Sequence, residues 1–282
     1  MLQMDTEPEH VRPFFVRGML RRFEYSQVYH PTREWDAAGS DLGRPFEDVY
    51  FMSADEVRLN AWFFPADAGS PRSDVAILIC HGNGGNVSHR LELCRMLLQT
   101  GVNVLVLDYR GYGRSEGSCN EEGTYQDAVA AWQWLRQRGF APRNIIALGK
   151  SLGGAVACEL ALRVELGGLI MESAFASIAA IGAERFPWLP VRWLHSIKYD
   201  NLNKLPRVRI PVLVMHSRAD NLIRFHHGEK IFAAAGEPKM FWETTGDHNH
   251  AQASDYDRCR EGIEKFLRLL ENAAAPSTTP KI

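Results

Sequence analysis

The stretch NIIALGKSLGGAVACELAL, residues 144–162, decides the fold. A short apolar run typical of a buried strand leads into Gly149-Lys150-Ser151-Leu152-Gly153, and an Ala/Leu-rich segment typical of a helix follows. A G-x-S-x-G sequence can arise by chance in a glycine turn, but its place between a strand and a helix favours a functional turn. We therefore expect the hydroxyl of Ser151 to project above the carboxyl end of the strand, beside the first helical turn.

The same alternation of strand and helix continues on both sides of this stretch. Further strands are expected at 75–80, 102–108, 167–173, 211–217 and 239–244, and further helices over 87–99, 125–138 (N-cap Thr124, with Gly139 after it), 222–235 and 255–270. Two aromatic and β-branched runs around the turn Ala54-Asp55-Glu56 predict a hairpin at one edge. Strands that are apolar on both faces and separated by helices indicate a mostly parallel sheet with helices on both faces.

We expect one α/β domain over residues 1–282. Residues 1–45 form an N-terminal extension with a helix over 11–25, and residues 272–282 form a disordered tail. Residues 174–208 contain no strand pattern, so we interpret them as a short excursion over the active site. Because that excursion is too short for a second domain, we expect no large lid.

Composition excludes some classes of protein. Hydrophobic residues make up 45% of the chain, and the formal net charge is −2 with a sequence pI of about 6.6, which argues against a nucleic-acid-binding protein. The one basic cluster is Arg17, Arg21 and Arg22. A solvated helix face is the favoured interpretation of this cluster, and weak contact with an anionic membrane surface is the alternative.

Cysteine usage and the N-terminal residues bear on location. The chain has five cysteines, an odd number, and no CxxC, which fits buried thiols in a reducing compartment. The first ten residues, MLQMDTEPEH, do not resemble a signal peptide, and no run of 18 apolar residues occurs. We predict a cytoplasmic protein with no integral membrane association.

A serine hydroxyl is a weak nucleophile at neutral pH and needs a base. Among the ten histidines, His248 follows the strand at 239–244 through a short loop, which places it at the same end of the sheet as Ser151. His250 is the alternative base. Asp220 follows the strand at 211–217, so we expect it to orient the imidazole, with Glu172 as the alternative acid. The order serine, aspartate, histidine is the one expected of this arrangement.

Other titratable residues have ordinary interpretations. His81 and His216 end strands and are expected to be structural. His226 and His227 are adjacent on a predicted helix, so they should point in different directions and form no ligand pair. We expect the carboxylate of Asp108 to hold the Arg110-Gly111 turn.

Acyl transfer also needs N–H donors for the negative charge that develops on a carbonyl oxygen. One candidate is the N–H of Leu152, fixed by the turn. The other is the N–H of Asn83, in the loop His81-Gly82-Asn83-Gly84-Gly85-Asn86 after the strand at 75–80. Glycines let this backbone approach a substrate closely. A plain glycine-rich turn into a helix is the alternative.

At these residues the chain resembles the α/β-hydrolase superfamily, and more narrowly the Bem46-like branch with its depalmitoylating hydrolases and bacterial esterases. The matching stretches are YHPTREW, DLGRPFEDVYF, LNAWFFPA, ILICHGNGGN, VLDYRGYGRSEG, GKSLGG, VLVMHSRAD and GDHNH. The resemblance implies an eight-stranded sheet, Ser151 with Asp220 and His248, the Asn83 and Leu152 amides as oxyanion hole, and no metal or cofactor. The chain departs from the family at Glu56 and Lys150, where glycine and arginine are usual. It also lacks the N-terminal membrane segment or cysteine cluster of lipid-anchored members.

The predicted function is hydrolysis of small-molecule carboxylic esters through an acyl-enzyme, with thioesters and peptides as alternative substrates. The predicted substrate-binding residues are Lys150 and the apolar side chains Phe175, Trp188 and Leu189. For the apolar side chains, ordinary packing at the edge of the core is the alternative interpretation. A non-catalytic hydrolase-fold binding protein is a hypothesis from another class. A metal-dependent hydrolase using Asp247, His248 and His250 is a third, but H-x-H in one loop is too sparse for a zinc site.

Overall fold

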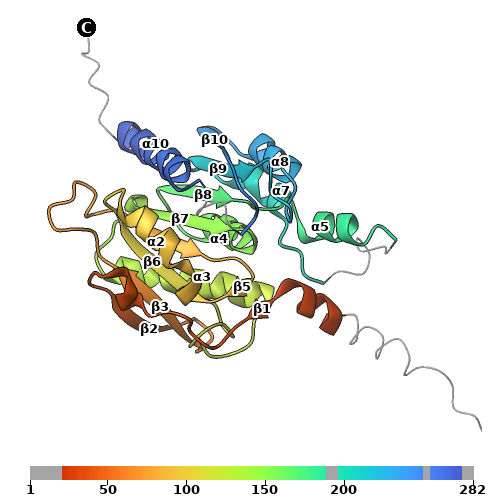
Figure 1. The fold of residues 1–282 in the computed structure, drawn as a ribbon, viewed down its shortest axis with the longest axis horizontal. Coiled ribbons are helices and arrows are strands. Elements are labelled where there is room, and N and C mark those ends of the chain that lie inside the picture. The colour runs from red at the N-terminus through yellow and green to blue at the C-terminus, as the bar shows by residue number, and fades with distance from the viewer. Residues whose placement is uncertain (1–20, 189–195, 250–254, 275–282) are drawn as a thin grey trace, which may run out of the picture.

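The computed structural model describes residues 21–188, 196–249 and 255–274. Its centre is an eight-stranded sheet in the order β10-β9-β8-β7-β4-β6-β3-β2 (Figure 1). These strands are β2 (Glu47–Met52), β3 (Arg58–Phe64), β4 (Ala76–Cys80), β6 (Asn103–Asp108), β7 (Ile145–Lys150), β8 (Gly168–Glu172), β9 (Val212–Ser217) and β10 (Lys239–Thr244). From β10 to β6 neighbours are parallel, whereas β3 and β2 are antiparallel, so the predicted mostly parallel sheet with an edge hairpin is confirmed.

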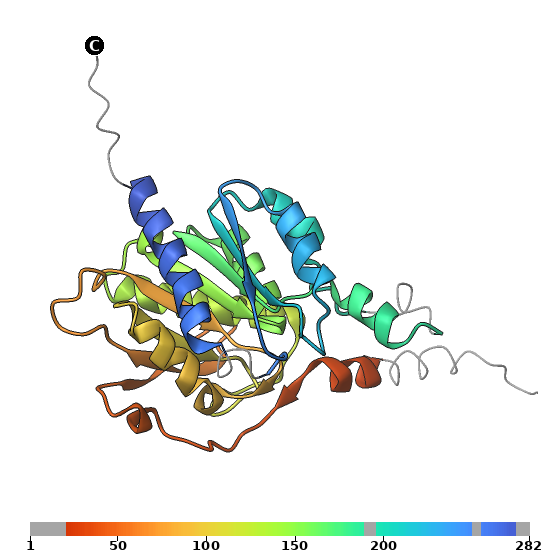
Figure 2. The same cartoon turned by 45° about the horizontal axis from the view of Figure 1, so that its top comes forward.

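Helices cover both faces of the sheet, as predicted, and each face has its own core. The apolar side chains of α2 (Leu91–Leu98) and α10 (Tyr256–Ala274) pack on one face, and those of α3 (Glu121–Gln137), α4 (Leu152–Arg163) and α8 (His226–Ala234) pack on the other (Figure 2). Alternate residues of a strand point to opposite faces. In β4, Leu78 joins one core and Ile79 the other, which explains why the sequence of this strand is apolar throughout.

Two helices begin at other residues than the sequence pattern predicted. α3 begins at Glu121 because the side chain of Asn120 accepts a hydrogen bond from the N–H of Gly123 at 2.8 Å, so the prediction of Thr124 as N-cap is wrong. Gly139 does follow this helix in the left-handed region, with φ +96°. The predicted helix over 222–235 begins only at His226.

Two other helices also differ from their predicted boundaries. The segment predicted as a helix over 87–99 opens with the 3-10 turn η2 (Val87–Arg90) before α2. α10 continues to Ala274, past the predicted end at 270, so the start of the expected tail is helical. The rest of that tail, residues 275–282, lies outside the described residues. Other 3-10 turns are η1 (Gly39–Leu42), η3 (Pro142–Asn144) and η4 (Leu205–Arg207).

The N-terminal extension and the excursion pack against each other. A helix over residues 21–28 forms part of the predicted N-terminal helix, and residues 11–20 lie outside the described part of the chain. The described part of the excursion contains α5 (Ile178–Arg185) and α7 (Asn201–Lys204). The carboxylate of Glu24 accepts hydrogen bonds from the backbone N–H groups of Ser196 and Ile197, at 2.8 Å each, and this joins the two segments.

A short two-stranded sheet pairs β1 (His30–Pro31) with β5 (Gly84–Gly85), so the N-terminal extension also contacts the loop after β4. In the described residues, all five cysteines are free thiols, and four of them are buried. None of the described helices is both long and apolar enough to cross a bilayer.

Candidate active site

Ser151 occupies a strained backbone position between β7 and α4. Its φ of +53° and ψ of −116° lie in a region that residues with side chains rarely adopt. A Cβ on Gly153 would lie 2.5 Å from the carbonyl carbon of Cys80 and 2.6 Å from the carbonyl oxygen of His81. Glycine is therefore required at this position for the turn to pack against β4, as the sequence pattern indicated.

Strand register brings the predicted residues to one edge of the sheet. Lys150 pairs with Glu172, Glu172 pairs with Met215, and Ser217 pairs with Thr244, so β7, β8, β9 and β10 end side by side. Ser151, Asp220 and His248 each follow one of these carboxyl ends. All three side chains are at least nine-tenths buried, with relative exposures of 7%, 6% and 4%.

Asp220 holds the imidazole of His248. The carboxylate oxygen Oδ2 lies 2.8 Å from Nδ1 of His248, and Oδ1 accepts hydrogen bonds from the N–H groups of Leu222 at 3.0 Å and Ile223 at 2.8 Å. These two bonds also keep residues 222 and 223 out of α8, which explains why that helix begins late. With Nδ1 donating to the carboxylate, Nε2 of His248 is left as the nitrogen that can accept a proton.

The charge state of Asp220 suits this arrangement. Burial alone would raise its pKa, but the hydrogen bond and charge of His248, with the N–H groups of Ile223 and Leu222, outweigh burial and leave the pKa below its usual value. Asp220 is therefore ionised at neutral pH and favours the imidazole orientation in which Nδ1 carries a proton.

Glu172 and Lys150 form a second charged pair beside Ser151. Oε1 of Glu172 lies 3.4 Å from Nζ of Lys150, and both side chains are largely buried. Of the two acids that the sequence left as candidates, Asp220 makes the 2.8 Å contact with the histidine. Lys150, predicted to bind substrate, contacts Glu172 in the structure. His250, the alternative base, lies outside the described residues.

The loop after β4 passes directly beside the serine. A Cβ on Gly82 would lie 3.6 Å from Cβ of Ser151. The carbonyl of Asn83 accepts hydrogen bonds from the N–H of His30 at 3.0 Å and from the hydroxyl of Tyr112 at 2.8 Å, which fixes the peptide plane on that side. Leu152 is the first residue of α4, where a helix leaves its N–H groups without intrahelical partners.

Sequence reasoning missed the residues that hold this loop. Tyr109 donates a hydrogen bond to the carbonyl of His81 at 3.0 Å, and Asp108 accepts one from the N–H of Val87 at 2.8 Å. Asp108 therefore anchors the loop after β4, and the expectation that it holds the Arg110-Gly111 turn is wrong. The available signal is the sequence DYRGYG, in which Asp108 ends β6 and Tyr109 directly follows it.

The Arg110 turn has other partners, which explains that error. The guanidinium of Arg110 pairs with Asp127 at 2.8 Å and with Asp55 of the β2–β3 hairpin at 2.6 Å. Asp55 is close to Arg110 only because β3 pairs with β6. The sequence separation of 55 residues gave no local hint of this pairing.

The predicted apolar pocket residues differ in environment. Phe175 is 4% exposed and belongs to the core cluster that α4 covers. Trp188 is 78% exposed and contacts the ring of Phe186. Leu189 lies outside the described residues.

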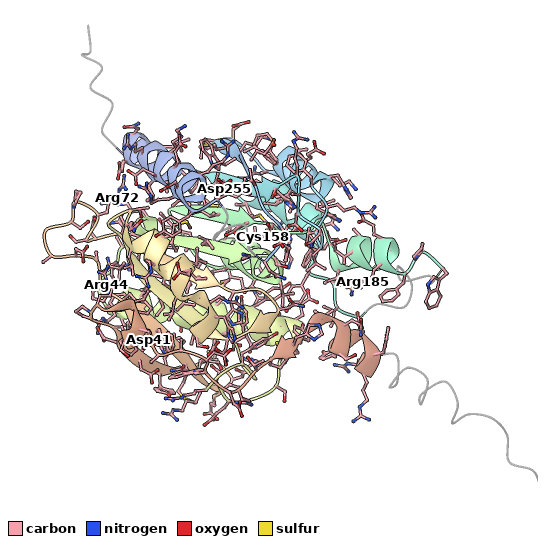
Figure 3. All side chains as sticks on the ribbon, in the orientation of Figure 1. Asp41, Arg44, Arg72, Cys158, Arg185 and Asp255 are labelled. Carbon is pink, nitrogen blue, oxygen red and sulfur yellow. The ribbon has the colours of Figure 1, made fainter. Side chains whose placement is uncertain are left out.

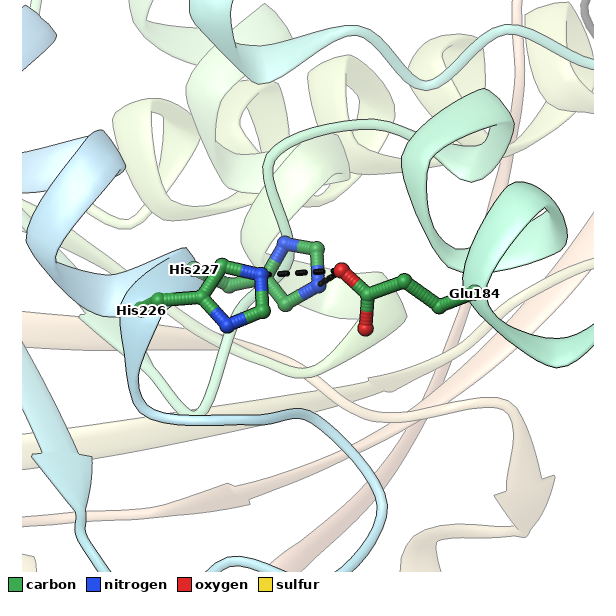
Figure 4. Close-up of side chains that lie close together, drawn as sticks. All are labelled: Glu184, His226 and His227. Carbon is green, nitrogen blue, oxygen red and sulfur yellow. Dashed lines mark hydrogen bonds and ion pairs between the residues drawn. The ribbon is translucent and has the colours of Figure 1, made fainter. Parts of the chain in front are cut away.

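The structure contradicts the expectation that His226 and His227 diverge. In the described residues, Glu184 on α5 and these two histidines at the start of α8 bring three possible ligand atoms within 4.8 Å of one another. Nε2 of His226 lies 2.8 Å from Oε1 of Glu184, and Nε2 of His227 lies 3.2 Å from the same oxygen (Figure 4). The histidines converge because the first turn of the helix starts at His226, where the chain has just left the Asp220 loop.

Hydrogen bonding argues against a metal ion at this cluster. Nδ1 of the buried His227 accepts a hydrogen bond from the N–H of Ala176 at 3.1 Å, so the proton of the neutral ring is on Nε2. Burial lowers the pKa of His227 to about 4, which keeps the ring neutral at pH 7. Nε2 therefore has no lone pair for a metal, and the cluster acts as a contact between α5 and α8.

The chain is similar to several known proteins. Residues 71–202 match the family described as "Serine aminopeptidase, S33". The uncharacterized protein Rv2307c of Mycobacterium tuberculosis is 36% identical over 255 residues, covering 90% of this chain and 89% of its own. The alpha/beta hydrolase domain-containing protein WAV2 of Arabidopsis thaliana is 31% identical, covering 77% of each chain.

Solved structures share the fold at lower identity. The esterase Pf2001 of Pyrococcus furiosus superposes with a TM-score of 0.70 at 22% identity, covering 86% of this chain and 98% of its own. An alpha-beta hydrolase from Vibrio vulnificus superposes with a TM-score of 0.66 at 22% identity, covering 92% of this chain and 98% of its own.

Proposed function

Because the chain belongs to the α/β-hydrolase superfamily, we propose that it is a serine hydrolase that cleaves carboxylic esters through an acyl-enzyme. One observation carries the proposal. A serine in a strained strand-to-helix turn lies at the same sheet edge as a histidine whose Nδ1 is 2.8 Å from a buried aspartate. This combination is what nucleophilic catalysis by a serine hydroxyl requires.

In the proposed mechanism, Oγ of Ser151 attacks the acyl carbonyl while Nε2 of His248 takes its proton. Asp220 keeps the imidazole oriented and stabilises the imidazolium. The N–H groups of Asn83 and Leu152 stabilise the oxyanion, and each such donor contributes roughly 2.7–4 kcal/mol to the transition state. His248 returns the proton to the leaving alcohol, then activates water to hydrolyse the acyl-enzyme.

The test compares the wild-type protein with Ser151→Ala on short p-nitrophenyl esters. We expect a loss of kcat on the order of 10⁴–10⁶-fold, as when a triad nucleophile is removed. Ser26→Ala, on the exposed helix over residues 21–28, is the matched control and should retain full activity. Equal rates for wild type and Ser151→Ala would remove Ser151 from the mechanism.

A second candidate activity is that of a serine aminopeptidase, favoured by the family description that matches residues 71–202. The same residues would serve, since the acyl carbonyl of an amide is attacked in the same way. Rates on aminoacyl p-nitroanilides, p-nitrophenyl esters and acyl thioesters, measured side by side, would rank the substrate classes. A non-catalytic binding protein would fail to react with a fluorophosphonate probe, whereas we expect labelling at Ser151.

We also propose that the protein acts in the cytoplasm. This proposal is supported by the five cysteines, which are free thiols, as expected in a reducing compartment. Fractionation of cells that produce the protein would test this location.

A further inference from the structure

Three aromatic side chains contact one another in a row, and two of them are exposed. Phe23 contacts Phe186 edge to face at 6.2 Å between ring centroids, and Phe186 contacts Trp188 in the same way at 6.2 Å. Phe23 is 48% exposed and Trp188 is 78% exposed. The described residues contain four exposed large hydrophobic side chains, and the other two are Met52 and Leu222. Half of the four therefore lie in this one cluster.

Arginines accompany these rings. Arg21 and Arg22 are exposed on the helix over residues 21–28, and the exposed Arg185 ends α5. Figure 3 shows Arg185 on α5, at the margin of the molecule. We call the three aromatic rings and the three arginines the basic aromatic face. The residues that precede it in the sequence, VRPFFVRGML at 11–20, contain the same combination of aromatic rings and arginines.

The acidic residues near this face are engaged with other parts of the protein. Glu24 accepts hydrogen bonds from the backbone of Ser196 and Ile197. Glu184 accepts a hydrogen bond from His226 and lies 3.2 Å from Nε2 of His227. Both carboxylates therefore hold the excursion in place, and the arginines face solvent. The face is positive although the whole chain has a formal net charge of −2.

From these observations, and beyond the proposed hydrolase activity, we propose that the basic aromatic face docks the protein on an anionic lipid surface. Tryptophan and phenylalanine are suited to the lipid interface, and arginines are attracted to anionic headgroups. A second copy of this chain fits the face less well, because a two-fold contact would bring its arginines against one another.

The face is also placed to serve the candidate active site. α5 begins six residues after Glu172, the end of β8, so it rises from the same sheet edge as Ser151. Figure 1 shows α5 and the helix over residues 21–28 next to each other beyond that edge. Docking would therefore turn the edge that contains Ser151 towards the membrane.

Co-sedimentation of the full chain with vesicles tests the proposal. One set of vesicles is pure phosphatidylcholine, and the other contains about 30 mol % phosphatidylglycerol. The variants are Arg21→Gln/Arg22→Gln/Arg185→Gln and Phe23→Ser/Trp188→Ser. Met52→Ser and Arg268→Gln are controls with similar exposure on other parts of the surface. Thermal unfolding verifies that each variant is folded.

We expect wild type to bind the anionic vesicles, and to bind them less in about 0.5 M salt. The arginine triple variant should bind on the order of 100-fold more weakly, at about fivefold for each arginine. The aromatic double variant should also lose binding, and the controls should bind as wild type does. The proposal is overturned if wild type ignores anionic vesicles, or if the folded triple variant binds as wild type does. It also fails if sedimentation shows a dimer that the aromatic variant dissociates and vesicles bind neither form.

Discussion

Gly153→Ala should damage both the fold and the catalytic site, because the added methyl group meets backbone rather than side chain. The new Cβ would lie 2.5 Å from the carbonyl carbon of Cys80 and 2.6 Å from the carbonyl oxygen of His81, and real Cβ contacts essentially never fall under 3.0 Å. Neither atom can rotate away. The end of β4 must therefore move away from α4, and the loop that contains Asn83 moves with it.

The size of the effect follows from this overlap. Overpacking a core typically costs about 1–3 kcal/mol, and a clash with fixed backbone should reach the top of that range, about 3 kcal/mol. Displacing the N–H of Asn83 from the oxyanion position should lower kcat by a further factor of about 10²–10³ among the molecules that remain folded. Urea unfolding and p-nitrophenyl ester hydrolysis measure the two effects separately.

Two neighbouring glycines supply controls. Gly84→Ala places a methyl group with nothing within 4 Å, so it should leave the free energy of unfolding unchanged or slightly higher. Gly154→Ala meets Cβ of Ala174 at 2.6 Å. Because that methyl carbon is fixed to its own backbone, this variant should also lose stability, but it leaves the loop after β4 in place. If Gly153→Ala unfolds and turns over ester as Gly84→Ala does, the turn and the loop are not coupled as we describe.

Four further outcomes follow from the same structure. Asp220→Asn should lower kcat about 10⁴-fold with little change in thermal stability, because an amide oxygen still accepts the two backbone hydrogen bonds; a loss under tenfold would contradict the assigned role. Glu56→Gly should raise the free energy of unfolding by about 0.5–1 kcal/mol, since Glu56 has φ +63°, whereas Glu56→Ala should give no such gain in the same urea titration. The pKa of His227 falls from an ordinary value near 6.5 to about 4 on folding, so its imidazole binds a proton more readily in the unfolded chain. The free energy of unfolding therefore decreases as pH falls from about 6.5 to about 4. This loss should reach about 3 kcal/mol and be absent in His227→Gln; equal pH slopes of the unfolding free energy for the two proteins would refute it. Ester hydrolysis should continue at the same rate in EDTA, and a loss restored by Zn²⁺ would point to metal chemistry instead.

Local sequence patterns were sufficient for the strands, most helices and the turn around Ser151. Each depends on the spacing of apolar residues and glycines within about ten positions, and the chain meets those constraints locally. The wrong prediction of the N-cap of α3 arose because two nearby polar residues could each have capped the helix. Asn120 caps α3 through its side-chain oxygen, whereas Thr124 uses its hydroxyl to donate to the carbonyl of Glu121.

Contacts between distant residues are different, because they depend on strand register and on which helices share a face of the sheet. The sequence placed Asp220 and Glu172 at comparable strand ends, and the fold brought Asp220 to 2.8 Å from His248. Glu184 meets His226 across 42 residues because α5 and α8 both leave the carboxyl edge of the sheet. Backbone preference and periodicity are properties of neighbouring residues, so the order of strands and helices and the position of Ser151 follow from the sequence alone. Side chains from different elements converge only once the whole core has packed, and so the partner of each buried charge was settled by the folded chain.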